Sequence, residues 1–418
     1  MIGLLAALGC REPPPEPAPA PVAPPVAAPA PVATTVWTTS NIGTLLPKAP
    51  TRKVAVGRAI PPLPAYDQAL QSLGPIIERY AGDPDNPWAV AHGILARGLG
   101  FLLADGREAI PHLFASFAEP HVVGARTLIG FPRARGAVRV EPHTDLLLKN
   151  MAEVGLDPEA RFATAAGEIS AADLYRWTVL KSFLVPKSDH SSWDDPNDIP
   201  WGAQALATWA PDPELQWVAT DGTPMDMDDV ADFLTAVVVK ESAFMVRAME
   251  SGESFERKGQ ALFGYTCGGA HLVQGTAYVV ARGFGRPEDR PYLERQAELL
   301  YYRLPIELDI YDEALKRNPK YRTKILVHRV KFLGHWLETM SKLQALGLHT
   351  PTDAQLRLIE GAAQNLTLAI GALEKTGVFA RMEALRKEDE QLYLDVVGDS
   401  CHAVRGLELA LGRQTLAW

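Results

Sequence analysis

The chain has 418 residues, 47% of them hydrophobic and 22% charged, which is the balance of a globular protein with a large buried core. Asp and Glu outnumber Lys and Arg by 50 to 41 and no basic block stands out, so the composition argues against binding to nucleic acid. Beyond residue 60, no apolar stretch long enough to cross a bilayer is free of charged residues, which excludes a transmembrane helix from that part of the chain.

The first ten residues form an apolar run that ends at a cysteine. They read MIGLLAALGC, with small residues just before Cys10. This segment resembles the lipobox of bacterial lipoproteins, in which cleavage of the signal leaves the cysteine as a lipidated N-terminus. The resemblance implies that residues 1–10 are the remnant of a lipoprotein signal and that Cys10 carries the lipid. It also implies a lipid bilayer as partner and a location in the cell envelope, on the periplasmic face or the outer surface.

Proline dominates the segment that follows. Residues 13–33 hold ten prolines, which alternate with alanine and valine. Because proline fixes φ and has no backbone N–H, such a tract cannot join a helix or a sheet and extends as polyproline II. We therefore predict that residues 11–60 are a disordered Pro/Ala-rich tether and that residues 61–418 are the folded domain. Within the tether, residues 34–39 could form a short strand or an ordered arm.

Helical periodicity begins at residue 65 and continues with short breaks. Asn86 followed by Pro87 is the signature of an N-cap with proline in the first turn, and the segment TPTD at 350–353 has the pattern of a capping box with Pro351 at the first helical position. Residues 120–142 are glycine-rich and irregular. The predicted helices cover residues 65–80, 87–103, 143–154, 170–183, 226–248, 319–346, 351–376 and 379–411.

Few segments show the alternation of a strand, so the sequence predicts an all-α domain of antiparallel helix pairs. Ten or more helices in one domain indicate an α/α toroid, a ring of antiparallel helical hairpins whose inner helices line a central cleft. A stacked solenoid is the alternative, and the lack of a fixed repeat disfavours it.

Three histidines share a local pattern of a small residue, the histidine, and a glycine close behind. They are His92, His271 and His402, and the last two have glycine four residues later. The pattern indicates equivalent positions on three helices, or else simply close packing of helices. Gly268 and Gly269 precede His271 and would let a ligand approach the backbone closely, at a helix start that favours a neutral imidazole.

Two other segments carry candidate polar chemistry. His335 and Glu338 are spaced i,i+3, so they face one side of a helix, and a glutamate there can orient a histidine or share its proton. A satisfied polar pair at a helix interface is the alternative. His143 and Asp145 lie at a helix start and are either ligand-binding residues or caps.

The cysteines offer two readings. If Cys10 is lipidated, Cys267 and Cys401 remain, and in an oxidising compartment they are expected to form a disulfide. The alternative is a zinc site formed by Cys267, Cys401 and His402 with water as the fourth ligand. Apart from that alternative, the sequence indicates no metal and no cofactor.

Three family likenesses attach to these residues. The run from Pro142 through His143, Thr144 and Asp145 to the segment CGGAH at 267–271 resembles an uncharacterised family of exported bacterial proteins, over residues 85–340. The segment GHWLE at 334–338 is similar to the Gly-His-x-x-Glu segment of α/α-barrel sugar epimerases. The order of His92, Cys267 and then Cys401 with His402 resembles lanthionine cyclases, which are zinc-containing α/α toroids; there the last motif is Cys-His-Gly, whereas here Ala403 follows the histidine.

The sequence thus predicts a membrane-tethered lipoprotein whose helical domain binds or processes a polar, glycan-like ligand. The cleft would be lined by five candidate catalytic residues, His92, His271, His335, Glu338 and His402. If the protein is an enzyme, a His/Glu pair would perform general acid/base chemistry. The alternative is a non-catalytic scaffold or binding lipoprotein of the cell envelope, with a glycan or protein partner and with structural histidines.

Overall fold

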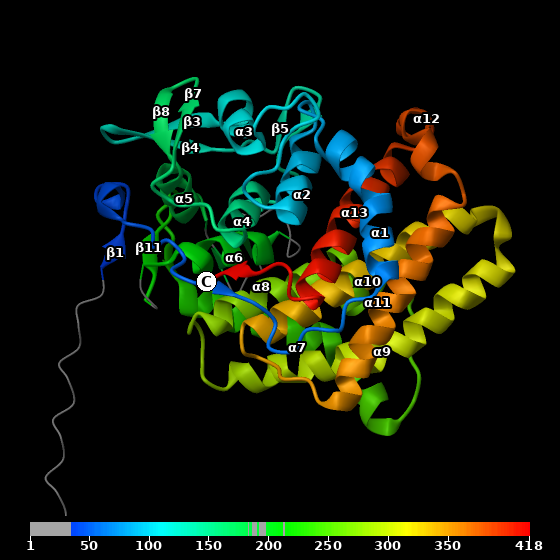
Figure 1. Ribbon diagram of the computed structural model, residues 1–418. Coiled ribbons are helices and arrows are strands. Elements are labelled where there is room, and N and C mark those ends of the chain that lie inside the picture. The colour runs from blue at the N-terminus through cyan, green and yellow to red at the C-terminus, as the bar shows by residue number, and fades with distance from the viewer. Residues whose placement is uncertain (1–34, 183, 186–189, 192–197, 212–213) are drawn as a thin grey trace, which may run out of the picture. The chain divides into compact units, whose positions relative to one another are not determined.

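The computed structural model describes residues 35–182, 184–185, 190–191, 198–211 and 214–418 (Figure 1). The chain divides into two units, Met1–Thr34 and Thr35–Trp418. The predicted lipobox with Cys10 and the proline tract lie outside the described residues. All structural statements below concern the second unit.

The fold is mostly helical, with 62% helix and 10% strand, which confirms the predicted class at this coarse level. The α-helices of the described residues are α1 (Pro64–Ile76), α2 (Pro87–Arg97), α3 (Ala109–Phe117), α4 (Leu146–Glu153), α5 (Ala171–Lys181), α6 (Ile199–Trp209), α7 (Met227–Ser251), α8 (Ala270–Ala281), α9 (Asp289–Arg317), α10 (Arg322–Ala345), α11 (Asp353–Glu374), α12 (Met382–Glu388) and α13 (Glu390–Ala410).

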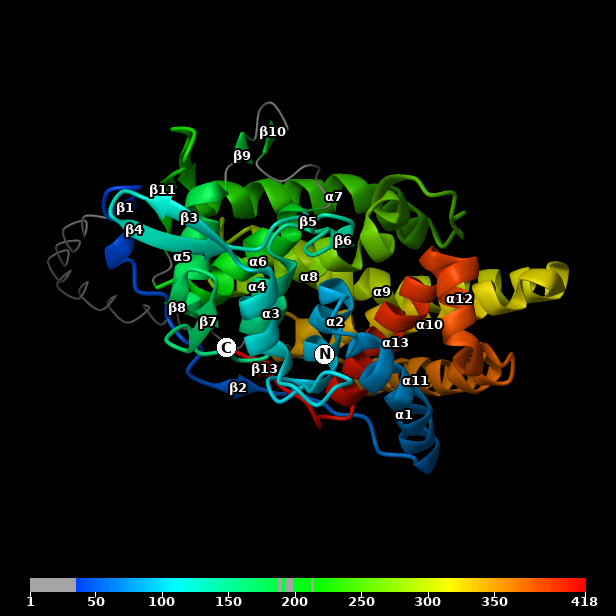
Figure 2. The ribbon, with the colours of Figure 1, turned by 90° about the horizontal axis from the view of Figure 1, so that it is seen from above.

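Six helices are buried along most of their length, and each packs on the next. Helix α2 contacts α4, α4 contacts α6, α6 contacts α8, α8 contacts α10, α10 contacts α13, and α13 contacts α2. Every residue of α4 and of α6 is buried. By contrast α1, α7, α9 and α11 keep exposed faces, as expected of amphipathic helices that cover a core. The core therefore lies around and between the six buried helices (Figure 2).

Helices α10 and α13 approach each other most closely, and glycine makes this possible. A Cβ placed on Gly406 would lie 2.5 Å from the carbonyl oxygen of Gly334, and one on Gly334 would lie 2.9 Å from the backbone nitrogen of Ala403. These separations leave no room for a side chain at either position. The absence of a Cβ thus brings the backbones of the two helices into direct contact.

The strands are short and form small sheets at the edges of the helical core. Among the described residues they pair as β1-β11-β12, β2-β13, β3-β4, β5-β6, β7-β8 and β9-β10, and these do not form a closed sheet. Their bounds are β1 (Val36–Trp37), β2 (Lys53–Val54), β3 (Glu119–Val123), β4 (Arg126–Gly130), β5 (Ala134–Arg135), β6 (Val138–Arg139), β7 (Arg161–Thr164), β8 (Gly167–Ser170), β9 (Leu184–Val185), β10 (His190–Ser191), β11 (Gln216–Val218), β12 (Pro224–Asp226) and β13 (Leu416–Ala417).

The folded unit begins before residue 61, where the sequence placed its start. Strand β1 pairs in parallel with β11, and β2 pairs antiparallel with β13. In the segment that connects β1 to β2, Ile42 and Leu45 are buried. Residues 35–60 therefore pack on the helical core, and the short strand expected within 34–39 is β1.

Several predicted helix ends agree with the structure and others shift. Asn86 caps α2 by accepting from the backbone nitrogen of Ala89, as predicted. The cap of α11 lies two residues later than predicted, because Thr352 rather than Thr350 forms the capping box, with Gln355. Helix α2 ends at Arg97 rather than near residue 103, because Gly98 takes a left-handed φ of 84°. Residues 120–142, expected to be irregular, contain the hairpins β3-β4 and β5-β6. None of the helices in the described part of the chain combines the length and apolarity required to span a bilayer.

Candidate functional site

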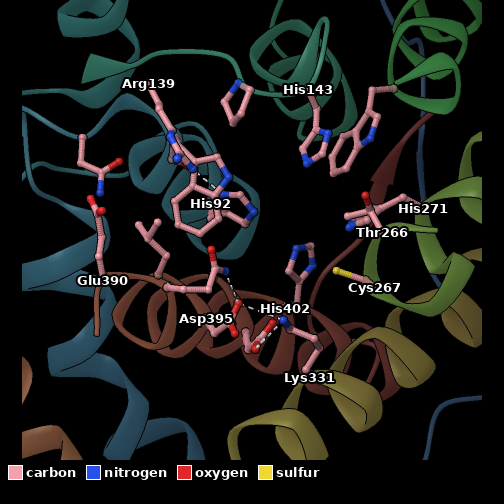
Figure 3. A pocket seen from close by; sticks show the side chains of 18 of the residues that line it. His92, Arg139, His143, Thr266, Cys267, His271, Lys331, Glu390, Asp395 and His402 are labelled. Carbon is pink, nitrogen blue, oxygen red and sulfur yellow. Dashed lines mark hydrogen bonds and ion pairs between the residues drawn. The ribbon is translucent and has the colours of Figure 1, made fainter. Parts of the chain in front are cut away.

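A polar pocket of about 560 Å³ opens between several of the buried helices (Figure 3). Helix α2 contributes His92, α6 contributes Trp201, α8 contributes His271 and α13 contributes His402. Mid-helix residues of α10 and the loop 137–143 complete the wall. His271 lies in the first turn of α8, where the positive end of the helix dipole favours a neutral imidazole and anionic or polar ligand groups.

Four of the predicted histidines come together at this pocket. The ring centroids of His335 and His402 are 3.9 Å apart, and those of His271 and His335 are 4.9 Å apart. The ring of His92 lies 5.3 Å from that of His402. These residues come from four helices, so the fold gathers side chains that are far apart in the sequence.

Hydrogen bonds fix the tautomers of two of these rings. The Nδ1 atom of His402 lies 2.7 Å from Glu338 Oε2, and Nδ1 of His92 lies 2.7 Å from the carbonyl oxygen of Trp88. A carboxylate and a carbonyl can only accept, so each Nδ1 carries the hydrogen and donates it. Nε2 of each ring is then left with its lone pair, as a base or a metal ligand requires.

Burial keeps the imidazoles neutral near pH 7. Desolvation is the main cause that lowers the pKa of His92 to about 4, and it holds the pKa of His271 and His402 well below the usual range. Desolvation also lowers the pKa of His335. All four rings can therefore accept a proton or bind a metal without first losing one.

Cys267 lies beside the imidazoles of His271 and His335. One ligand atom from each of the three residues lies within 4.8 Å of the other two. Cys267 sits in a left-handed backbone conformation with φ of 54°, which is unusual for a residue with a side chain. Burial raises the pKa of its thiol to about 12. His335, Glu338 and His402 form a second group in which one potential metal-ligand atom from each residue lies within 4.8 Å of the other two.

The predicted disulfide between Cys267 and Cys401 is wrong. Both cysteines are free, and they do not lie at disulfide distance. Cys401 is fully buried and absent from the pocket wall, whereas its neighbour His402 faces the pocket. Successive residues of a helix point in different directions, so only one of the two can face a given partner. For the same reason Cys267, Cys401 and His402 do not form one of the potential metal groups of the described residues.

A connected group of buried charged and amide side chains lies beneath the histidines. We call it the central polar network, and its side chains, all at most 3% exposed, come from α4, α6, α8, α10 and α13. Its members are Lys149, Glu153, Gln204, Gln274, Glu338, Lys342 and Arg405.

Two carboxylates organise the central polar network. Lys342 Nζ lies 2.7 Å from Glu338 Oε1 and 2.9 Å from Glu153 Oε2. Glu153 also accepts from Lys149 at 3.1 Å and from Arg405 at 3.2 Å. Burial alone would raise the pKa of Glu338, but the attraction of Lys342 and the interactions with the neighbouring histidines together outweigh it and hold that pKa well below its usual range. Glu338 is thus an anion fixed directly behind His402.

The predicted ligand-binding residues lie in different places. His143 reaches the pocket, where it stacks on Trp201 and holds Asp198 Oδ1 at 3.0 Å from its Nδ1. Asp145 does not: it is 1% exposed and accepts from Thr178 and Lys181. Gly268 and Gly269 are buried behind Cys267, and both have the positive φ expected for glycine.

Comparison with protein-family models, curated proteins and solved structures finds no match. The side chains of the pocket are therefore the basis for assigning a function to this chain.

The central polar network was not predicted from the sequence. A signal for it exists, because Lys149 with Glu153 and Glu338 with Lys342 are i,i+4 pairs inside helices that are otherwise apolar. A helix that is apolar on all sides has no face exposed to solvent. Charged side chains in such a helix must therefore pair with charged or polar side chains of other helices. The pocket residue Trp201 was also not predicted. It lies in α6, a segment that was not predicted to be a helix.

Proposed function

We propose that this chain is a tethered lipoprotein of the cell envelope whose folded unit binds and processes a polar, glycan-like ligand in the histidine-lined pocket. The observation that carries the proposal is the convergence of four neutral imidazoles on one polar pocket, with Glu338 behind His402. Structural histidines scattered through the packing would have no reason to meet in this way.

The proposed chemistry is general acid/base catalysis by His402. Its Nε2 accepts a proton from a hydroxyl or an acidic C–H of the ligand, and Glu338 stabilises the imidazolium that results. This is the role of an anion hydrogen-bonded to the far side of a catalytic histidine. The second neutral ring with a free Nε2, that of His92, is placed to act on the same ligand.

The pocket rim suits a ligand with many hydroxyl or charged groups. Lys331 Nζ lies 3.0 Å from Asp395 and 3.6 Å from Asp399 at one side of the pocket. Arg139 and Glu390 add charges of both signs (Figure 3). Neighbouring cations and carboxylates suit sugar hydroxyls, because the cation donates a hydrogen bond to a hydroxyl oxygen and the carboxylate accepts one from a hydroxyl hydrogen.

The α/α toroid remains part of the proposal. It is supported by the cyclic order of contacts through α2, α4, α6, α8, α10 and α13, which returns to its start. The resemblance of residues 334–338 to the Gly-His-x-x-Glu segment of sugar epimerases also supports the toroid. Within that segment, His335 lines the pocket and Glu338 belongs to the central polar network.

Lipid attachment at Cys10, the extended tether and the envelope location are proposals from the sequence alone. They are tested by expressing the full chain in a bacterial host with a traceable fatty acid. We expect the wild-type protein to carry the label and Cys10→Ala to lose it. An unlabelled wild-type chain would remove the anchor from the proposal.

The ligand is sought by screening the full chain against soluble cell-wall and polysaccharide fragments for binding and turnover. For a fragment that is turned over, His402→Gln is expected to lower kcat by roughly 10²–10⁴-fold with little change in KM, because the proton acceptor is lost. The matched control is His349→Gln, a half-buried histidine that contacts Tyr301 away from the pocket. Binding without turnover in every case would support the non-catalytic alternative, and an unchanged kcat in His402→Gln would contradict the assignment of the base.

A further inference from the structure

We infer that Cys267, His271 and His335 form a binding site for a divalent transition-metal ion of the zinc class. The inference goes beyond the acid/base function proposed above, which requires no metal. It rests on the grouping of three ligand atoms, on an unpartnered buried imidazole and on the way the neighbouring carboxylate is already engaged.

The three ligand atoms have nearly the spacing that a metal ion needs. They lie within 4.8 Å of one another. Zinc bonds of about 2.0–2.3 Å in a tetrahedral site place ligand atoms roughly 3.5 Å apart. Small side-chain rotations would close the difference. His271 is on the first turn of α8, Cys267 precedes that helix, and His335 is on α10, so two packed elements hold the three ligands.

His335 provides the independent indication of a ligand. Its ring is 2% exposed, yet neither nitrogen has a hydrogen-bond partner among the described residues. The separation of 3.8 Å between its Nδ1 and Glu338 Oε2 is too long for a hydrogen bond. Leaving buried polar atoms without partners is unfavourable, and a bound ion would satisfy one of the two ring nitrogens.

The competing group of His335, Glu338 and His402 is less suited to hold an ion. Oε1 of Glu338 is 2.7 Å from Lys342 Nζ, and Oε2 accepts from His402 Nδ1. Both oxygens are therefore engaged. Glu338 occupies the position of a carboxylate that orients an imidazole from behind rather than that of a ligand.

The donor set determines the class of metal. One sulfur and two imidazole nitrogens are borderline-to-soft donors, which select zinc and its neighbours over magnesium or calcium. Three protein ligands leave a fourth position open to water or a ligand, as in catalytic rather than structural zinc sites. The ring of His402, whose centroid is 3.9 Å from that of His335, belongs to the same pocket as the three ligands.

The test uses cobalt(II) as a spectroscopic substitute for zinc in the purified full chain. We expect one equivalent of cobalt to bind and to give the thiolate-to-cobalt charge-transfer band, together with intense tetrahedral d–d bands. Cys267→Ser should lose the charge-transfer band, and His335→Gln should weaken cobalt binding by at least tenfold. Cys401→Ala is the matched control, because it removes the other free cysteine of the described residues and should leave the spectrum unchanged.

A wild-type protein without the thiolate band would overturn the inference, even if Cys267→Ser did not fold. A band that survives in Cys267→Ser, or that disappears in Cys401→Ala, would overturn it as well. Cobalt bound without a thiolate band but lost in His335→Gln would assign the ion to His335, Glu338 and His402 instead. Turnover that persists in metal-free protein and falls in His402→Gln would leave the acid/base proposal standing when the metal site fails.

Discussion

Glu153 is the residue on which most of the central polar network depends. It is fully buried in α4 and pairs with Lys149, Lys342 and Arg405. Burial alone would raise the pKa of its carboxyl, but the three cations outweigh that effect and lower the pKa. The carboxylate is therefore ionised in the folded protein, and each buried cation near it depends on that charge.

Replacing Glu153 should expose this dependence. We expect Glu153→Gln to lower the free energy of unfolding by about 3–5 kcal/mol, because it leaves buried cations without a counter-charge. Urea denaturation measures the change. The control is Glu313→Gln, which breaks pairs with Lys316 and Arg317 at the surface and should leave the free energy of unfolding almost unchanged, because solvent screens exposed ion pairs. Equal losses in the two variants would mean that the network adds no more than a surface pair.

Glu141 predicts how stability changes with pH. Burial raises the pKa of its carboxyl from 4.5 to about 8. Between these values the folded protein holds a proton that the unfolded chain has released, so stability falls as pH rises from about 4.5 to about 8. This group alone contributes a slope of up to about 1.4 kcal/mol per pH unit. Unfolding measured at pH 5, 6, 7 and 8 should show a flatter profile for Glu141→Gln, and superimposable profiles would refute the shift.

At the scale of the element, the contact between α10 and α13 sets the geometry of the site. Gly334 and Gly406 allow backbone contact between these helices, and Glu338 of α10 thereby reaches His402 of α13. The glycine four residues after His271 has the same function, because a Cβ on Gly275 would lie 2.5 Å from the carbonyl oxygen of Pro200 in α6. The shared His-x-x-x-Gly spacing thus combines a pocket residue with a point of close helix packing.

A methyl group at Gly406 should separate the two helices. We expect Gly406→Ala to destabilise the fold by about 1–3 kcal/mol, since its Cβ meets backbone atoms that cannot move aside alone. It should also reduce any turnover, by lengthening the contact between Glu338 and His402. Gly361→Ala in α11 is the control: its Cβ meets nothing within 4 Å, so the substitution should stabilise by about 0.5–1 kcal/mol. Thermal unfolding of both variants distinguishes packing from helix propensity, and the same sign in both would contradict this account.

Helices with one apolar stripe were predictable, and others were not. The apolar stripe of α11 and the cap at Asn86 lie in local sequence, and the structure agrees with both. Helix α6 is apolar on all sides and α9 is strongly charged, so neither has the one-sided pattern by which a helix is recognised.

The same contrast holds for the candidate site. Local patterns identified His92, His271, His335 and His402, but only the fold decides which atoms face one another. The disulfide failed at this step, because His402 faces the pocket and its neighbour Cys401 therefore turns elsewhere in α13.

At the scale of the whole folded unit, residues 35–60 tie distant parts of the chain together. The carbonyl oxygen of Leu45 accepts from buried Arg176, and Lys48 donates to the carbonyl oxygen of Trp209. Ile42, Leu45 and Ile60 are at most 2% exposed. This stretch is part of the core despite its proximity in sequence to the proline tract.

Two truncations test that boundary. Removing residues 1–34 should leave the free energy of unfolding unchanged, because the folded unit begins at Thr35. Removing residues 1–60 should lower it by on the order of 5 kcal/mol, since three fully buried aliphatic side chains are lost at about 1.5–3 kcal/mol each. Denaturant midpoints of the two proteins provide the comparison. Unaltered stability in the longer truncation would restore the sequence-based boundary at residue 61.

The pairing of β2 with β13 also has a consequence for biogenesis. Val54 is among the first residues of the folded unit to leave the ribosome, and its strand partner Leu416 is made long afterwards. Helices α2 and α13, which bring His92 to His402, are separated in the same way. The fold is therefore completed only when segments more than 300 residues apart in the chain meet. Closing such long stretches of chain is entropically unfavourable, so we expect the histidine pocket to form late in folding, after the local helices.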